Sequence, residues 1–153
     1  MRLALFEPDI PPNVGTLIRL GACLRVPVDI IGPCGFPASE KSLRRAALDY
    51  LEHAEIAHHL SWSHFLNGLA PGARIILLTT RSDLVYTRFG FAAGDILLVG
   101  RESAGVPPTV RDRADAHVTV PMVPGRRSLN VAVAAAMVLG EALRQTGLWP
   151  GQE

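Results

Sequence analysis

The stretch Val120-Pro-Met-Val-Pro-Gly-Arg-Arg-Ser-Leu-Asn130 runs from a short apolar segment through a proline- and glycine-rich turn into an apolar helix. In α/β proteins this order of strand, tight loop and helix start often holds a ligand, because the free N–H groups of the first helical turn point into the loop. Ser128 is the predicted N-cap. Asn130 is polar within an otherwise apolar helix start, and an unpaired amide there costs on the order of 1–3 kcal/mol. The stretch predicts a ligand loop, and the apolar helix after it predicts a core or intersubunit position.

Length and composition limit the class of protein. The chain has 153 residues, of which 48% are hydrophobic and 19% are charged, and these values fit one globular domain and argue against a disordered chain. The longest apolar run, 131–139, is shorter than the roughly 20 residues of a membrane helix, and the first residues lack the apolar region of a signal peptide. We therefore expect a cytoplasmic protein with no membrane association.

Charge and cysteine content exclude two further classes. The net charge of +1 limits any nucleic-acid surface to local basic groups. Cys23 and Cys34 lack a Cys-x-x-Cys spacing, so neither a disulfide scaffold nor a metal site is predicted.

Short apolar runs alternate with helical segments along the whole chain. The expected strands are 3–6, 28–31, 74–79, 96–99 and 117–120. The expected helices are about 13–25, 40–47, 62–69, 107–113 and 128–146, with an irregular segment at 81–94 and a tail after Gly147. This alternation predicts a single α/β domain over 1–153, with a mostly parallel sheet covered by helices on both faces.

A second motif, Asn13-Val-Gly-Thr-Leu-Ile-Arg19, follows Pro11-Pro12. Asn13 is a candidate N-cap, and Gly15 allows a backbone or a ligand to approach closely in the first helical turn. On a helical wheel Arg19 lies opposite the apolar stripe. A solvated arginine is the simpler interpretation, and the alternative is an arginine that binds a phosphate or a reacting hydroxyl.

The third motif, Gly100-Arg-Glu-Ser-Ala-Gly105, joins a strand to a helix that begins with proline. Its two glycines open the backbone to a ligand such as a nucleoside. It is not a serine-hydrolase elbow, because Arg101 stands where the first glycine of Gly-x-Ser-x-Gly should be. Neither a Rossmann nor a Walker fingerprint occurs in the chain. Glu102 is either an exposed loop carboxylate or a group that binds a cofactor or fixes the loop.

Together these motifs resemble the SPOUT (SpoU-type) RNA methyltransferases, and more closely their minimal TrmL type. The resemblance rests on Phe6-Glu-Pro-Asp-Ile-Pro-Pro-Asn-Val-Gly-Thr-Leu-Ile-Arg19, Leu43-Arg-Arg-Ala-Ala-Leu-Asp-Tyr50, Gly100-x-Glu-x-x-Gly105 and Pro121-Met-Val-Pro-Gly-x-x-Ser-Leu-Asn130. Each motif alone is weak, but their order and spacing over nearly the whole chain are specific.

The resemblance implies an α/β fold whose C-terminal part, about 75–150, forms a deep trefoil knot that binds S-adenosylmethionine and releases S-adenosylhomocysteine. It implies a homodimer that methylates the ribose 2′-hydroxyl of the wobble nucleotide, cytidine or uridine, in the tRNA anticodon loop. Two alternatives stay open: another RNA substrate such as ribosomal RNA, or a non-catalytic RNA-binding protein that retains the fold.

The family pattern also implies roles for individual residues. The cofactor contacts are Leu78, Gly100, Glu102, Gly105, Val120, Met122, Ser128 and Leu129. Arg19 acts at the reacting hydroxyl, while Asn13, Ser128 and Asn130 orient the loops and the substrate. We expect RNA to contact the basic residues Lys41, Arg44, Arg45, Arg126 and Arg127.

Two positions depart from the family pattern. Val131-Ala132-Val133 replaces a common Leu-Ser-Asn, and Gly140 replaces a common tyrosine. Because Arg19, Glu102, Ser128 and Asn130 remain, we expect activity to be kept, with a possible change in substrate preference.

Overall fold

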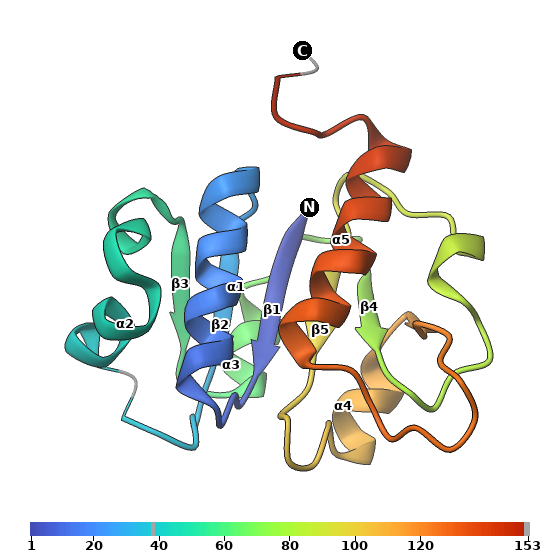
Figure 1. Cartoon of the computed structure of the whole chain (residues 1–153), viewed down its shortest axis with the longest axis horizontal. Helices are drawn as coiled ribbons and strands as arrows, with labels where there is room; N and C mark the ends of the chain where they lie inside the picture. The colour runs from blue at the N-terminus through green and yellow to red at the C-terminus, as the bar shows by residue number, and fades with distance from the viewer. Residues whose placement is uncertain (38, 152–153) are drawn as a thin grey trace.

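A computed structural model describes residues 1–37 and 39–151 of the chain. In this part of the chain six strands form one parallel sheet with the order β3-β2-β1-β5-β4-β6 (Figure 1). The strands are β1 (Arg2–Phe6), β2 (Val28–Ile31), β3 (Ile56–His59), β4 (Ile75–Leu78), β5 (Ile96–Val99) and β6 (Ala116–Val118). The helices are α1 (Pro11–Leu24), α2 (Glu40–Ala47), α3 (Trp62–Asn67), α4 (Pro108–Arg113) and α5 (Val131–Thr146), with 3-10 turns η1 (Leu48–His53) and η2 (Tyr86–Arg88).

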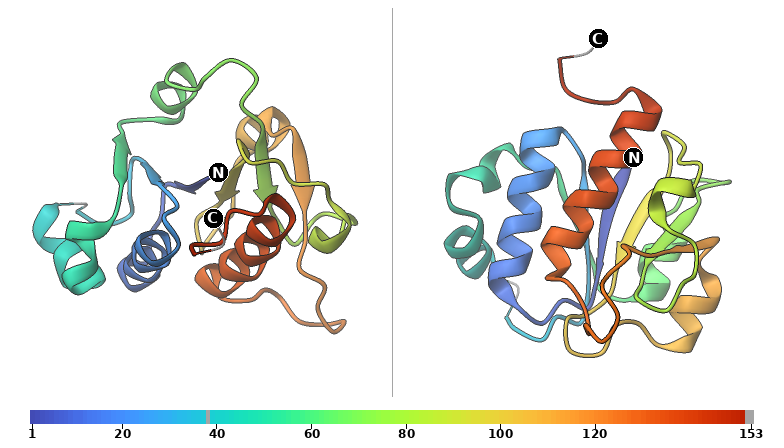
Figure 2. Two further views of the ribbon diagram at one scale, coloured as in Figure 1. Left: turned by 90° about the horizontal axis from the view of Figure 1, so that it is seen from above. Right: turned by 45° about the vertical axis from the view of Figure 1, so that its right-hand side comes forward.

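The helices cover both faces of the sheet, as predicted. Helices α1, α2 and α5 lie on one face, and α3 and α4 lie on the other (Figure 2). Side chains alternate along the strands, because successive residues of a strand point to opposite faces. In β1, Leu3 and Leu5 pack towards α1 and α5, while Ala4 and Phe6 pack in the cluster that includes Phe65 of α3. The two apolar clusters give the sheet a core on each side.

Edge strand β3 was not predicted. Its sequence, Ile56-Ala-His-His59, has two polar residues, and none of its four residues is fully buried. A strand at the edge of a sheet buries less side-chain surface than a central one, so its apolar signal is weak.

Two helix starts differ from the sequence prediction. Helix α1 begins at Pro11 and not at Asn13, because the prolines occupy the first helical positions, where a missing N–H is tolerated. Helix α5 begins at Val131, and Asn130 is its N-cap, with a side-chain oxygen that accepts from the backbone N–H groups of Ala132 and Val133. The predictions of Asn13 and Ser128 as N-caps are therefore wrong.

Helix α5 follows an edge strand but lies over the middle of the sheet, in contact with α1 and β5 (Figures 1 and 2). The C-terminal half of α5 is hydrogen-bonded to the segment that joins β4 to β5. Gln145 donates to the Phe89 carbonyl at 3.0 Å and accepts from the Phe91 N–H at 2.9 Å. Gly140 faces Trp149, where an added Cβ would meet the ring at 3.8 Å, so this contact does not demand glycine. The trefoil knot remains a prediction.

Candidate active site

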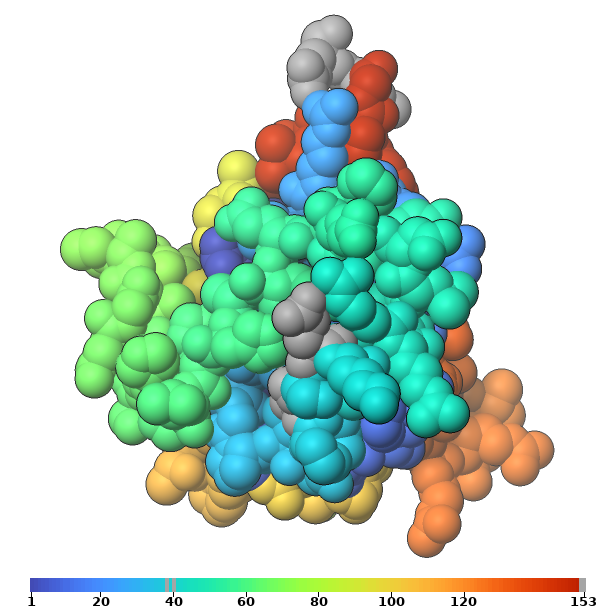
Figure 3. Space-filling model, turned by 90° about the vertical axis from the view of Figure 1, so that its left-hand side faces the viewer, coloured from blue at the N-terminus to red at the C-terminus, as the bar shows by residue number. Residues whose placement is uncertain are grey.

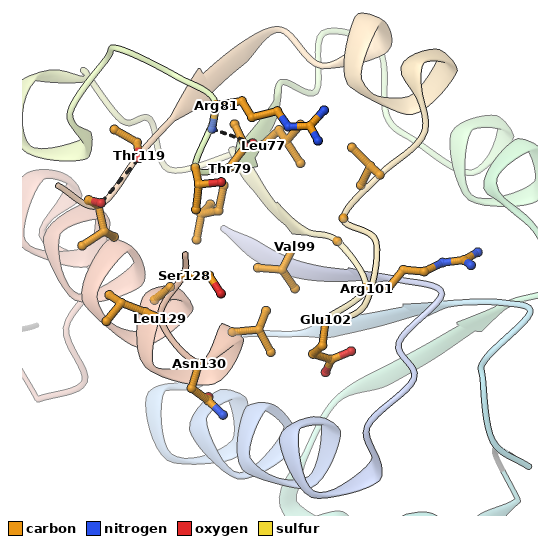
Figure 4. A pocket seen from close by; sticks show the side chains of 18 of the residues that line it. Leu77, Thr79, Arg81, Val99, Arg101, Glu102, Thr119, Ser128, Leu129 and Asn130 are labelled. Carbon is orange, nitrogen blue, oxygen red and sulfur yellow. Dashed lines mark hydrogen bonds between the residues drawn. The ribbon is translucent and has the colours of Figure 1, made fainter. Parts of the chain in front are cut away.

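A cavity of about 470 Å³ lies at the carboxyl ends of β4, β5 and β6, beneath the loop that leads to α5 (Figure 4). The carboxyl edge of a parallel sheet is the usual position of a ligand site in α/β proteins. Eight residues were predicted to contact a cofactor, and all eight line this cavity: Leu78, Gly100, Glu102, Gly105, Val120, Met122, Ser128 and Leu129.

The loop after β5 is closed on itself. Arg101 and Gly105 exchange backbone hydrogen bonds of 3.1 and 2.8 Å, and Gly105 has a φ of +66°. A Cβ at position 100 would lie 2.6 Å from the carbonyl carbon of Gly105. The loop therefore needs glycine at both positions, and these two residues leave its backbone open to the cavity.

A chain of hydrogen bonds joins the three sequence motifs at one end of the cavity. The Asn130 Nδ2 donates to the Asn13 Oδ1 at 2.9 Å. The Asn13 Nδ2 donates in turn to the Glu102 Oε1 at 3.1 Å. Because the Asn130 Oδ1 also caps α5, this one amide links the start of α5 to α1 and the loop after β5. The polar residue at the helix start thus has partners, as the sequence required.

Asp9 holds the other side of Glu102. The backbone N–H of Asp9 donates to the Glu102 Oε2 at 3.2 Å, and the backbone N–H of Glu102 donates to the Asp9 Oδ1 at 3.2 Å. The Ser103 hydroxyl donates to the second oxygen of Asp9. Asp9 lies within the Glu-Pro-Asp-Ile-Pro-Pro-Asn motif directly after the first strand, but no role for it was predicted from the sequence. These bonds, here named the Asp9 clamp, fix the loop after β1 to the loop after β5.

The pKa values of the two carboxyl groups of the clamp are shifted in opposite directions. Burial raises the pKa of Glu102 above its ordinary value, and the adjacent Asp9 carboxyl raises it further. Hydrogen bonding with Glu102 and Ser103 lowers the pKa of Asp9. Asp9 therefore carries the more persistent negative charge of the pair.

Ser128 and Leu129 reach the cavity from the loop before α5 (Figure 4). Both residues are exposed at this surface, with Leu129 at 40%. A hydroxyl and an apolar side chain that border the same cavity can contact a ligand directly.

Arg19 does not line the cavity. It lies six residues beyond Asn13 on α1, about 9 Å further along the helix axis. Its side chain is exposed and contacts Tyr50 of η1. The chain itself thus brings Asn13, Ser128 and Asn130 to the cavity but leaves Arg19 outside it.

The five predicted RNA contacts fall into two groups, both outside the cavity lining. Lys41, Arg44 and Arg45 lie exposed on α2, where Arg44 pairs with Glu52 at 3.1 Å. Arg126 and Arg127 lie in the exposed loop before α5, which projects from the body of the molecule (Figure 3). Basic side chains are therefore present on two separate elements.

The polar residues that line the cavity but were not assigned from the sequence include Thr79, Thr80, Arg81, Arg111 and Thr119. Three of them follow β4 directly. Because β4 lies beside β5, the residues after β4 could have been expected next to the loop after β5. Residues 1–37 and 39–151 contain no cluster of His, Cys, Asp and Glu that could hold a metal ion. The same residues form no helix that is long and apolar enough to cross a membrane.

The chain is similar to bacterial tRNA-modifying enzymes over nearly its whole length. It is 55% identical over 146 residues to a tRNA (cytidine(34)-2′-O)-methyltransferase of Beijerinckia indica, covering 95% of this chain and 91% of the relative. It is 39% identical over 153 residues to the protein of the same name in Escherichia coli K12, covering 99% and 96%.

Solved structures agree with these relatives. A structure that describes the 2-OH methylation of C/U34 on tRNA superposes with a TM-score of 0.88 at 40% identity and covers 94% of each chain. The SpoU methyltransferase AviRb of Streptomyces viridochromogenes, solved with the cofactor AdoMet, superposes with a TM-score of 0.85 at 26% identity, covering 95% of this chain and 57% of that one. A sequence model of the SpoU rRNA methylase family matches residues 1–140, and the chain belongs to this family.

Proposed function

We propose that this protein transfers a methyl group from S-adenosylmethionine to the ribose 2′-hydroxyl of the wobble nucleotide, cytidine or uridine, of tRNA. The observation that carries the proposal is the match over nearly the full length of both chains, at 55% identity, to an enzyme named for 2′-O-methylation of cytidine 34. We place the reaction in the cytoplasm.

The cavity fits the cofactor by size and by lining. A volume of about 470 Å³ is within the ordinary range of small-molecule pockets, roughly 300–1,000 Å³. Apolar side chains such as Leu78 and Val120 suit an adenine ring, and the open backbone at Gly100 suits its polar edge. When bound, S-adenosylmethionine supplies an activated methyl group on a sulfonium.

The protein must then align two substrates and assist the loss of a proton from the 2′-hydroxyl as its oxygen gains the methyl group. Glu102, Asn13 and Asn130 hold the loops around the cavity in fixed relative positions through their hydrogen bonds. A guanidinium is a poor base, so Arg19 contributes by positioning the hydroxyl or its neighbouring phosphate and by stabilising negative charge.

We further propose that the active form is a homodimer whose tRNA site draws residues from both subunits. Helix α5 and the residue before its cap expose three large apolar side chains, Leu129, Val133 and Met137, at 40%, 51% and 41%. An exposed apolar patch of this kind is typical of a protein interface. A second copy would also bring an Arg19 to a cavity that the chain's own Arg19 does not line.

The test is methyl transfer by the purified protein from labelled S-adenosylmethionine to tRNA, followed by mapping of the labelled nucleoside. We expect label at nucleotide 34, and we expect Arg19→Ala to remove the label while cofactor binding by calorimetry is unchanged. Full labelling by Arg19→Ala would contradict the proposed role of the arginine.

The family description names ribosomal RNA, so ribosomal RNA is the second candidate substrate. Nucleoside mass spectrometry of tRNA and rRNA from a deletion strain separates the two, since only the true substrate loses a ribose methyl group. Tight RNA binding with no cofactor binding would instead favour a non-catalytic protein.

A further inference from the structure

The sequence block Leu43-Arg-Arg-Ala-Ala-Leu-Asp-Tyr50 packs directly against α1. Leu43 and Ala47 are buried in the same apolar cluster as the inner face of α1. The two backbones touch at Gly15, where a Cβ would lie 2.2 Å from the Ala46 carbonyl oxygen. The block therefore has a fixed position relative to the helix that carries Arg19.

The chain changes direction sharply within this block. Leu48 ends α2 with a φ of +55°, a left-handed conformation that bulky residues rarely adopt, and its side chain is 63% exposed. Residues held in such conformations persist where the surrounding structure over-determines them. The turn at Leu48 starts η1 and places Tyr50 beside the exposed face of α1.

Tyr50 lies against the guanidinium of Arg19. The Arg19 Cζ is 4.6 Å from the centroid of the Tyr50 ring, within the range of a cation–π contact. The Arg19 Nη2 also donates to the Tyr50 hydroxyl at 3.4 Å. Because the guanidinium carbon lies over the ring and one N–H bonds the Tyr50 hydroxyl, the other N–H donors stay available to a substrate oxygen or a phosphate.

Two other arginines of the described residues lie over an aromatic ring, Arg74 and Arg101, and each of them also has a carboxylate partner. Arg74 lies 5.4 Å from the centroid of the Phe89 ring, but Asp95 also holds it through two hydrogen bonds of 2.7 Å. Among the described residues, Arg19 forms no ion pair, and its side chain contacts Tyr50. A long side chain on an exposed helix face would otherwise sample many rotamers.

We propose that Tyr50 is a positioning residue, whose ring fixes the plane of the Arg19 guanidinium for methyl transfer. The inference rests on the proposed function, and it gives the Leu43–Tyr50 block a role: the block docks on α1 to deliver this ring. Tyr50 acts through Arg19 and does not itself touch the reacting atoms.

The kinetic test compares Tyr50→Leu and Tyr50→Phe, with the RNA that the wild type labels. Tyr50→Leu removes the π face, so we expect kcat to fall about tenfold while the KM for RNA changes about twofold or less. Tyr50→Phe keeps the ring and loses only the 3.4 Å hydrogen bond, so we expect kcat within about twofold of wild type.

Phe89→Leu is the matched control, since it removes the ring beneath Arg74, a residue outside the cavity lining. We expect it to leave kcat unchanged, with thermal unfolding recorded for every variant. Equal losses in Tyr50→Phe and Tyr50→Leu would overturn the proposal, and so would a wild-type kcat in Tyr50→Leu.

An NMR measurement tests the geometry without any activity. The Arg19 Nε–Hε signal, assigned by its loss in Arg19→Lys, should show a ring-current shift in the wild type and in Tyr50→Phe, and lose it in Tyr50→Leu. An identical signal in all three proteins would refute the stacked arrangement. If the wild type labels no RNA, the proposed function fails, while this measurement still decides whether Tyr50 holds Arg19.

Discussion

Two pairs of carboxylates at opposite ends of the sheet have different partners, although Glu7 at the carboxyl end is also paired with an arginine, Arg101. At the amino end Asp29 and Asp95, 2% and 1% exposed, are each held by an arginine. Arg2 binds Asp29 through bonds of 2.7 and 2.9 Å, and Arg74 binds Asp95 through two bonds of 2.7 Å. These pairs neutralise the buried charge within the fold.

At the carboxyl end, Asp9 and Glu102 are held by backbone N–H groups, the Asn13 amide and the Ser103 hydroxyl. Such partners satisfy hydrogen bonds without cancelling charge. The contrast indicates that the amino end is built for stability, while the carboxyl end keeps a polarised site for a ligand. Substitutions at the amino end should therefore change the free energy of unfolding and spare activity, and those at the carboxyl end should do the reverse.

The largest expected effect on stability is that of Asp29→Ala. The change leaves Arg2 without its main partner and also removes the 2.8 Å contact with His59. We expect the free energy of unfolding in urea to fall by about 3 kcal/mol. The Kd for S-adenosylmethionine, measured on the folded variant by calorimetry, should stay within about twofold of wild type.

Glu52→Ala is the control for this change, because Glu52 pairs with Arg44 where both side chains are largely exposed. It should lower the free energy of unfolding by less than about 1 kcal/mol. A tenfold weaker cofactor Kd in Asp29→Ala would show that the two ends are coupled.

Two variants of Asn130 separate its role as the N-cap of α5 from its hydrogen bond to Asn13. Asn130→Ala removes both the N-cap of α5 and the bond to Asn13, so we expect about 1 kcal/mol less stability and roughly 100-fold slower methyl transfer. Asn130→Asp keeps an oxygen for the cap but loses the donor to Asn13. We expect near wild-type thermal stability with the same loss of rate, and a wild-type rate in Asn130→Asp would count against the link between the motifs.

The sequence predicted the parts of the fold that depend on local pattern. Buried parallel strands such as β5 are continuous apolar runs, and their alternation with helices predicted both the sheet and its covered faces. Strand β3 was not predicted because two of its four residues are histidines, which weaken the apolar pattern of this edge strand. The start of α1 was misplaced because its N-cap, Ile10, makes no side-chain cap bond, and the start of α5 was misplaced because Ser128 and Asn130 are both capping residue types.

The site was predictable as a set of loops but not as a network. Family resemblance supplied Glu102, Asn13 and Asn130, whereas the bonds between them join residues about 90 to 117 positions apart. No local pattern reports such contacts, and this is why Asp9 was missed. The place of Arg19 outside the cavity was equally invisible, since helix periodicity gives its face but not the neighbours of that face.

The Asp9 clamp should affect cofactor binding more than stability. Asp9→Asn replaces one carboxylate oxygen with a donor, so either the Glu102 N–H or the Ser103 hydroxyl loses its acceptor. We expect the cofactor Kd to weaken about fivefold, equivalent to the loss of about 1 kcal/mol, with kcat nearly unchanged. Ser103→Ala is the matched variant, because it removes one donor and leaves the Glu102 contacts, and its effect should be smaller. If both variants bind the cofactor as the wild type does, the clamp has no role in binding.

The smallest effect is a pH dependence of stability, and its sign distinguishes Glu102 at the cavity from Glu141, which pairs with Arg144 on α5. Because burial raises the pKa of Glu102, the folded state binds its proton more tightly than the unfolded state does. Its contribution to the free energy of unfolding therefore falls as pH rises from about 4.5, the ordinary glutamate value, through the raised pKa.

Glu141 should behave in the opposite way. Hydrogen bonds from Arg144 and Gln145 lower its pKa to about 2, so its contribution is present above about 4.5 and is lost as pH falls towards 2. Urea unfolding at a series of pH values should show that Glu102→Gln removes a component that falls with rising pH, and that Glu141→Gln removes one that rises. Asp9, whose pKa is lowered, opposes Glu102 only below its own ordinary value of about 3.8, so readings above that pH isolate the contribution of Glu102. Slopes of the same sign for both variants would mean that Glu102 is solvated like a surface carboxylate, and the contrast between the two ends of the sheet would then rest on the arginine pairs alone.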